Sequence, residues 1–198
     1  MNGKQIVSVV ALILFAGFGF AADTYVTDPV HSNVVFTVQH LVVSKVSGRF
    51  KEFSATLVYD DSDLSKSSLT GMIKTASIST DNDKRDGHLR SADFFDAEKY
   101  PEITFQSKKV EKEGDEIRVS GALTIRGVSK DVTFPVTIAG PIKDPRGNSR
   151  LGVEASLKIN RMDFGVAWNN PLEGGGVVVG NDVWITINGE LAKEVPKQ

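Results

Sequence analysis

The chain has 198 residues, of which 40% are hydrophobic, a formal net charge of −2 and no cysteine. The lack of cysteine excludes disulfides, thiolate catalysis and cysteine-based zinc sites. A mildly acidic chain without a long basic run is also not a candidate for nucleic-acid binding, and its length suits one well-buried domain.

The first 21 residues have the pattern of a secretory signal peptide. Lys4 precedes the apolar run IVSVVALILFAGFGF, and small residues stand three and one positions before Ala22. The run is shorter than the roughly 20 residues that a membrane-spanning helix needs. We therefore predict cleavage before Ala22, with one domain over 22–198 and no membrane span in the mature chain. A retained membrane anchor is the alternative.

Strands are predicted in the first half of this domain, because apolar and polar residues alternate with a period of two. In the first strand, His40 has the same parity as the apolar positions. The predicted strand segments are 32–40, 49–59, 69–80 and 102–110. Segment 82–93 instead favours a short helix, since residues at 81–83 supply candidate N-caps and Arg85, His88, Leu89 and Ala92 fall on one side.

The second half alternates more regularly, and turn-forming residues separate its strands. The apolar row from Leu151 to Ile159 continues on the same parity to Arg161. The predicted strand segments are 117–126, 132–138, 151–159 and 182–191. About eight strands with one apolar face each, and no βαβ spacing, predict an all-β, antiparallel barrel with one short helix. A β-sandwich is the alternative.

Three cationic residues interrupt the apolar rows at strand ends, namely His40, Arg49 and Arg161. Arg49 belongs to its row only if no bulge interrupts segment 49–59. A buried, unpaired cation is costly. These side chains therefore either contact a polar ligand group at a barrel mouth or hydrogen-bond to loop carbonyls at the rim, and an ion pair with a nearby acid is a further alternative for Arg161. Arg85 and His88 on the expected helix join the same set. We predict that these five residues contact a ligand head group.

The sequence contains no pattern typical of a catalytic or metal site. Its three histidines are His31, His40 and His88, and none belongs to an HxH or HExxH pair. His31 and His40 also fall on opposite strand parities. A serine nucleophile elbow and a Walker loop are missing as well. We therefore predict no catalytic residue and no metal site.

Five blocks of sequence follow one another in a recognisable order: DPVHSNVVFTVQHL, VSGRFKEF, SISTDNDKRDGHLRSADFFDAEKYPEITFQS, VSGALTIRGVSKDVTFPV and NRMDFGV. In this order, from about Thr24 to Leu191, the chain closely resembles the YceI-like family of bacterial envelope proteins. The resemblance implies a lipocalin-like barrel around a long apolar tunnel, a periplasmic or secreted location, and often a homodimer. It also implies binding of extended amphiphiles such as isoprenoid quinones, polyprenyl phosphates or fatty-acyl amides, with no catalytic reaction established for the family.

The shared parity of the apolar rows identifies the side chains that would line such a tunnel, if all rows face one interior. The predicted tail-lining residues are Phe36, Val38, Phe53, Leu57, Phe94, Phe95, Phe105, Leu123, Phe134, Leu157 and Phe164. Phe94 and Phe95 stand in an unusually charged segment. They either close over the tunnel as a lid or form ordinary core beneath a capping helix.

The expected function is that of a periplasmic, non-catalytic carrier for a long amphiphilic lipid, most simply an isoprenoid. The ligand itself would be the quinone or lipid, and no other cofactor is expected. Two alternatives from other classes remain at this point. One is a lipid-modifying enzyme that uses His31, His40 or His88 for acid–base chemistry, and the other is a module that binds a protein partner.

Overall fold

A computed structural model describes residues 22–194 of the chain. The predicted signal peptide, residues 1–21, lies outside the described residues. The strands are β1 (Asp23–Thr27), β2 (Asn33–His40), β3 (Ser44–Phe50), β4 (Phe53–Tyr59), β5 (Ser68–Lys74), β6 (Ile78–Ser79), β7 (Glu102–Glu113), β8 (Glu116–Ile125), β9 (Val128–Lys143), β10 (Ser149–Asn160) and β11 (Val179–Lys193). The helices are η1 (Leu64–Lys66), η2 (Thr75–Ser77), α1 (Asp83–Arg90) and η3 (Arg161–Phe164). None of the helices within 22–194 is long and apolar enough to cross a membrane.

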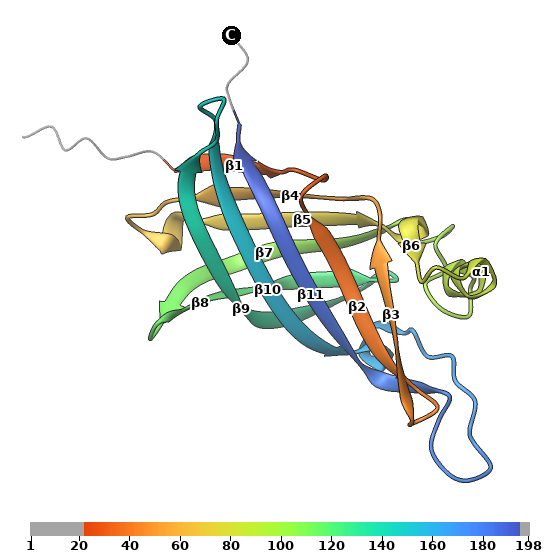
Figure 1. The fold of residues 1–198 in the computed structure, drawn as a ribbon. Coiled ribbons are helices and arrows are strands. Elements are labelled where there is room, and N and C mark those ends of the chain that lie inside the picture. Colours follow the sequence, from red (N-terminus) through yellow and green to blue (C-terminus); the bar gives the residue numbers. More distant parts are fainter. Residues whose placement is uncertain (1–21, 195–198) are drawn as a thin grey trace, which may run out of the picture.

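Eight strands close a ring in the order β1, β4, β5, β7, β8, β9, β10, β11 and back to β1, with antiparallel neighbours throughout (Figure 1). β11 pairs with two strands along the same edge: residues 179–188 pair with β2, and residues 191–193 pair with β1. β2, β3 and β6 therefore extend the wall beyond the ring toward α1. The predicted antiparallel barrel is confirmed, and the sandwich alternative is wrong.

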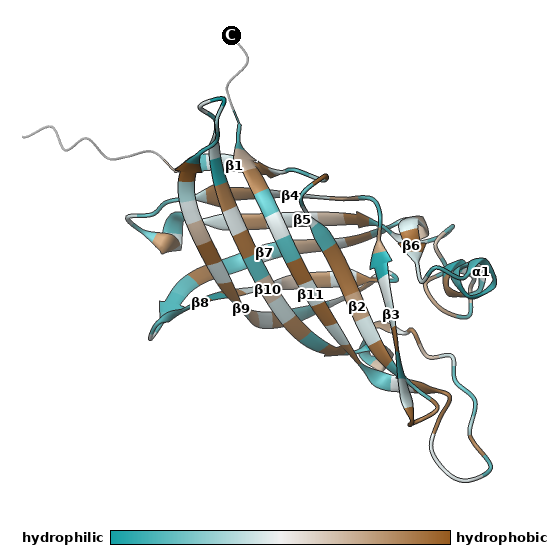
Figure 2. Cartoon of the chain, viewed as in Figure 1, coloured by the Kyte–Doolittle hydropathy of each residue, from teal (hydrophilic) through white to brown (hydrophobic). Residues whose placement is uncertain are grey.

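Alternation along the strands determines which side chains face the interior, because successive residues of a strand point to opposite faces. Figure 2 shows this alternation as bands of apolar and polar residues along β9, β10 and β11. In β10, Ala155, Leu157 and Ile159 face inward, and the residues between them are exposed. The apolar faces of all the strands therefore meet in one interior.

The predicted strand 49–59 is interrupted, and this changes its parity. β3 ends at Phe50 and β4 begins at Phe53, with a bend at residues 51–52 between them. Phe50 and Phe53 both face the interior although they are three positions apart. Because the bend shifts the alternation by one residue, Arg49 lies on the outer face of the barrel, and the prediction that it faces inward is wrong.

The predicted helix 82–93 is shorter than expected. α1 begins after Asn82, whose side chain accepts a hydrogen bond from the backbone N–H of Arg85 at 3.0 Å. It ends at Arg90, because Ser91 is extended and its hydroxyl donates to the carbonyl of His88. Residues 91–99 form turns instead. Similarly, the predicted strand 69–80 divides into β5, η2 and β6.

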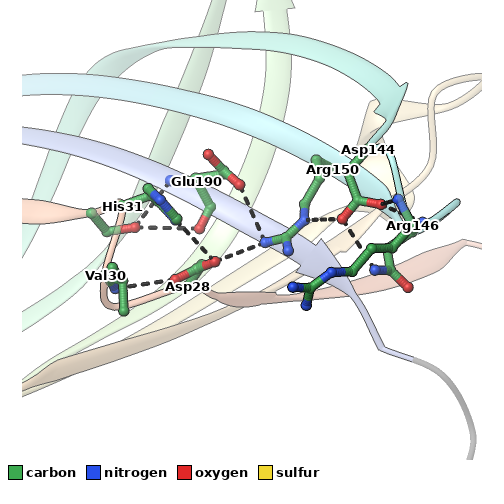
Figure 3. A network of polar contacts seen from close by, with 9 residues as sticks. Asp28, Val30, His31, Asp144, Arg146, Arg150 and Glu190 are labelled. Carbon is green, nitrogen blue, oxygen red and sulfur yellow. Dashed lines mark hydrogen bonds and ion pairs between the residues drawn. The ribbon is translucent and has the colours of Figure 1, made fainter.

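An ion-pair network lies at the barrel end away from α1 (Figure 3). The Arg150 guanidinium, on β10, donates to Asp28 at 2.8 Å and to Asp144 at 3.2 Å, and it lies 3.2 Å from Glu190. His31 contacts Asp28 from the other side. The hydrogen bond from Arg150, followed by that from His31, lowers the pKa of Asp28 to about 2. The Asn148 side chain, with backbone N–H groups and Arg150, lowers the pKa of Asp144 to about 2.

This network predicts a specific loss of stability in acid. A carboxylate with a lowered pKa stabilises the fold above its ordinary value of 3.8, and the contribution is lost as the pH falls toward about 2. We expect Arg150→Gln to lower the melting temperature at pH 6, and we expect the difference from the unmodified protein to shrink between pH 4 and pH 2. Thermal melts across this range measure the effect. A difference that stays constant down to pH 2 would show that the ion pairs are not its source.

Candidate functional site

The interior of the barrel contains an apolar cavity of about 260 Å³. All eight strands of the ring contribute side chains to its wall, as do β2 and β3. Its lining extends from Tyr59 and Leu191 at the Arg150 end to Phe94 and Arg161 at the α1 end. Within residues 22–194, Arg161 is the only charged residue in the lining. We call this space the barrel cavity.

The structure brings all the side chains that the sequence assigned to a lipid tail to the wall of the barrel cavity. They are Phe36, Val38, Phe53, Leu57, Phe94, Phe95, Phe105, Leu123, Phe134, Leu157 and Phe164. Sequence reasoning missed Phe50, whose inward direction follows from the bend after β3, and the aliphatic residues Ile103, Val183 and Ile185. The alternation of apolar and polar residues does indicate that the last three face inward, because they share a face of the sheet with residues assigned to the lipid tail.

Phe94 and Phe95 lie in the turns after α1 and belong to both the core and the cavity wall. Phe94 is buried, and its ring centroid lies 5.0 Å from that of His88 and 5.1 Å from that of Trp168. Phe95 packs edge-on against Phe50 at 6.2 Å. The two rings therefore cover the α1 end of the barrel cavity.

The charged residues around these rings hold α1 against the barrel. Asp86 is buried and accepts hydrogen bonds from the backbone N–H and the hydroxyl of Thr80, just after β6. Burial by itself raises the pKa of Asp86, but the bonds from Thr80 and the charges of Arg90 and Arg85 outweigh it, and the net shift is downward. Arg90 donates to the carbonyls of Ala76 and Ile78. Asp86 is thus a charged anchor for the helix.

A second, smaller cavity of about 190 Å³ adjoins the first beside α1. We call it the mouth pocket. Its wall includes His40 at the end of β2, Thr80, and both Arg85 and His88 of α1. The residues that line both cavities are Phe36, Val38, Leu89, Phe94 and Val179. Three of the five predicted head-group residues therefore meet where the apolar interior gives way to a polar rim.

The polar groups of the mouth pocket are fixed by contacts within the protein. Arg85 donates from Nε to the Thr80 hydroxyl at 2.7 Å and from a terminal nitrogen to the Thr80 carbonyl at 2.9 Å. The His88 Nε2 atom lies 2.8 Å from a carboxylate oxygen of Asp93. Arginine and histidine donors on a short, anchored helix suit the recognition of a phosphate or a quinone oxygen.

A comparison with known families agrees with this architecture. Residues 25–191 match the model of the YceI-like domain. The chain belongs to the YceI-like family. Protein YceI of Escherichia coli O6:H1 is 40% identical over 157 residues, which cover 79% of this chain and 82% of the relative.

Solved structures of similar proteins share the barrel of this YceI-like chain. The crystal structure of Burkholderia cenocepacia BcnA matches with a TM-score of 0.73 and 27% identity, covering 83% of this chain and 98% of that one. A polyisoprenoid binding domain from Saccharophagus degradans matches with a TM-score of 0.62 and 17% identity, covering 87% and 99%. The second likeness concerns the fold alone.

The remaining two predicted head-group residues of this YceI-like protein lie outside the mouth pocket. Arg49 is half exposed on the outer face of β3, where it pairs with Asp81 at 3.0 Å. Arg161 is 5% exposed, and it donates to the carbonyls of Val166, Trp168, Val179 and Gly180. Of the alternatives for Arg161, hydrogen bonding to loop carbonyls is therefore the one observed.

The three histidines of the YceI-like chain do not form one site. His31 lies in the Arg150 network before β2, whereas His40 ends β2 in the mouth pocket. Nine residues of mostly extended chain place them roughly 30 Å apart. His40 and His88 share the mouth pocket, and His31 lies apart from both.

Trp168 is a residue of the site that sequence reasoning missed. It lies in the irregular segment between η3 and β11, lines the mouth pocket, and packs against both His88 and Phe94. A segment without period-two alternation carries no local signal for the direction of a side chain. The aromatic character of Trp168 in a glycine-rich, polar stretch was the only indication available.

Proposed function

We propose that this YceI-like protein binds one long isoprenoid lipid, a quinone or a polyprenyl phosphate, as a non-catalytic carrier in the periplasm. The tail would occupy the barrel cavity and the head group the mouth pocket. The observation that carries the proposal is the apolar barrel cavity, with one charged residue in its lining and a pocket lined by Arg85, His40 and His88 at one end.

The physical reason for such a site is the low solubility of a long hydrocarbon chain in water. Burying each methylene is worth about 0.8 kcal/mol, so partial burial of an isoprenoid tail already gives strong binding. The costs of ordering the ligand keep the affinity well below that sum. The similar fold of a domain described as polyisoprenoid binding supports the choice of ligand class.

Two further observations support the carrier role. Arg85 is held in position by its two bonds to Thr80, and His88 lies beside Asp93, so a head group would meet side chains that are already positioned. The secretory pattern of residues 1–21 supports a periplasmic location. Polyprenyl phosphates and quinones both carry a head group rich in hydrogen-bond acceptors, which suits these donors.

Native mass spectrometry of the protein isolated from its own periplasm tests the proposal. We expect an additional mass that corresponds to one lipid, which organic extraction releases as an intact isoprenoid. A chemically altered lipid that accumulates with time would instead indicate an enzyme. Protein that carries no lipid and binds neither ligand class in titrations would contradict the carrier role.

A variant of the mouth pocket should separate head-group binding from tail binding. We expect Arg85→Gln together with His40→Gln to weaken binding of a polyprenyl phosphate about ten-fold or more, because hydrogen bonds to a charged group contribute about 1.5–3 kcal/mol. Binding of a neutral polyprenol of equal length should change much less. Competition titrations with the two ligands measure the difference, and Arg49→Gln on the outer face is the matched control. Equal losses for both ligands would place the head group elsewhere.

A further inference from the structure

The turn between β2 and β3 exposes an aliphatic surface at the α1 end of the barrel. Leu41, Val42 and Val43 are 39%, 55% and 85% exposed, and Val177, in the loop before β11, is 38% exposed. We call these four residues the apolar tip. Figure 1 shows the β2–β3 turn and the loop before β11 projecting together from this end of the molecule. Such a cluster of exposed aliphatic residues is typical of an interaction surface.

The two segments of the apolar tip contact each other and adjoin the mouth pocket. The backbone N–H of Leu41 donates to the carbonyl of Val178 at 2.9 Å. The next residues inward along both segments, His40 and Val178, line the mouth pocket. Whatever binds the apolar tip therefore lies directly beside the opening through which a ligand would reach the barrel cavity.

The backbone of the turn does not explain its apolar residues. Leu41 and Val42 have positive φ angles of 51° and 65°. A β-branched residue rarely adopts this conformation, and glycine or asparagine is the usual choice there. The exposed side chains contribute little to the core either. Neither local conformation nor packing requires aliphatic residues at these positions.

The surroundings of the apolar tip indicate what chemistry it would meet. Trp184, on the outer face of β11, is 40% exposed, and the ammonium of Lys45 lies 5.6 Å from its ring centroid. Glu173 is the only acid in segments 41–45 and 170–178, and it is exposed. An aliphatic tip flanked by an exposed tryptophan and a lysine is the arrangement that proteins present to the water–lipid interface.

We propose that the apolar tip inserts into the surface of a lipid bilayer and places the mouth pocket against the membrane. Val42 and Val43 enter the acyl region, and Trp184 and Lys45 lie at the level of the head groups. A lipid can then pass between the bilayer and the barrel cavity with little exposure of its tail to water. Membrane docking goes beyond lipid binding, and each can be measured without the other.

Flotation with vesicles of phosphatidylethanolamine and phosphatidylglycerol tests the docking, using the chain that begins at Ala22. We expect the double variant Val42→Asn and Val43→Ser to lower the partition coefficient about ten-fold, because the two most exposed anchors become polar. Asparagine suits the positive φ of Val42, so the fold is retained. The matched control is the double variant Val30→Ser and Ile142→Ser, which changes residues that are 82% and 65% exposed at the Arg150 end. This control should partition like the unmodified protein.

Several outcomes would overturn the proposal. The proposal fails if the unmodified protein does not float with the vesicles. It also fails if the tip and control variants lose equally in partition coefficient. A tip variant that converts a dimer to a monomer, without vesicle binding by either form, would identify a second copy as the occupant. Quinone binding in vesicle-free solution should be the same for the tip variant and the unmodified protein. If neither the tip variant nor the unmodified protein bound quinone, the proposed function would be contradicted and the docking result would be unaffected.

Discussion

Gly71→Phe is expected to abolish lipid binding without destabilising the protein. Gly71 lines the barrel cavity on β5, and it is paired with Ala55 and Phe105 on the neighbouring strands. A Cβ at this position would lie 3.9 Å from the nearest atom, which is ordinary van der Waals contact, and its φ angle is not positive. The phenylalanine ring would therefore occupy the space that we assign to the lipid tail.

The expected loss of affinity is at least ten-fold for both a quinone and a polyprenyl phosphate. The melting temperature should stay the same or rise, because glycine inside a strand costs up to about 1 kcal/mol and the ring gains apolar contacts. Binding titrations and thermal melts on the same preparation measure both effects. A loss of affinity without a fall in melting temperature distinguishes a filled cavity from a damaged fold.

Thr70→Phe is the matched control for this experiment. Thr70 precedes Gly71 on the same strand, is exposed, and faces outward. The same ring at this position cannot reach the barrel cavity, so lipid binding should be unchanged. If Gly71→Phe binds lipid as well as Thr70→Phe does, then the tail does not occupy the barrel cavity.

Arg161→Met is expected to be the most destabilising of the substitutions considered, by about 3–5 kcal/mol. The guanidinium donates at 2.9 Å to the carbonyls of Trp168 and Gly180 and at 3.1 Å to that of Val179. Burial lowers the pKa of Arg161, and these carbonyls compensate part of the cost of keeping the charge there. Methionine fills the space but removes this donor from the carbonyls of Val166, Trp168 and Gly180, whereas that of Val179 keeps the hydrogen bond from Asn169.

Urea unfolding measures this effect, and two further variants sharpen the result. Arg161→Lys should recover only part of the stability, since one ammonium cannot reach carbonyls on both sides of a planar guanidinium. Arg49→Met removes the other misassigned arginine, whose half-exposed pair with Asp81 contributes about 0–1 kcal/mol. A stable Arg161→Met protein that had lost its preference for polar-headed lipids would instead restore Arg161 to the head-group site.

Period-two alternation was sufficient to identify the inward face of each uninterrupted strand. Phe134 and Leu157 illustrate this, because residues i and i+2 share a face for as long as the strand continues. Arg49 shows the limit of the method. The bend at residues 51–52 shifts the alternation by one residue. The residue types there, Lys51 and Glu52, do not distinguish a bend from a continuing strand.

The environment of Arg161 could not be predicted, because it depends on contacts with a segment that has no regular structure. Two of the four carbonyls that it binds, those of Val166 and Trp168, belong to this segment, and carbonyl direction in irregular chain is not encoded by residue type. The end of α1 is a similar case. Ala92 continues the apolar spacing of the helix, but the turn that starts at Ser91 follows from its own hydrogen bonds and from the burial of Phe94.

The pairing of the first strand with the last imposes an order on folding. β1 pairs with residues 191–193 of β11, and the rest of β11 supplies the partner for β2 and for β10. During synthesis the ring therefore cannot close until nearly the whole chain has emerged, and earlier strands wait with unpaired edges. Such long-range closure slows folding. Truncation before residue 179 would leave β1, β2 and β10 each with one unpaired edge, and such edges promote aggregation.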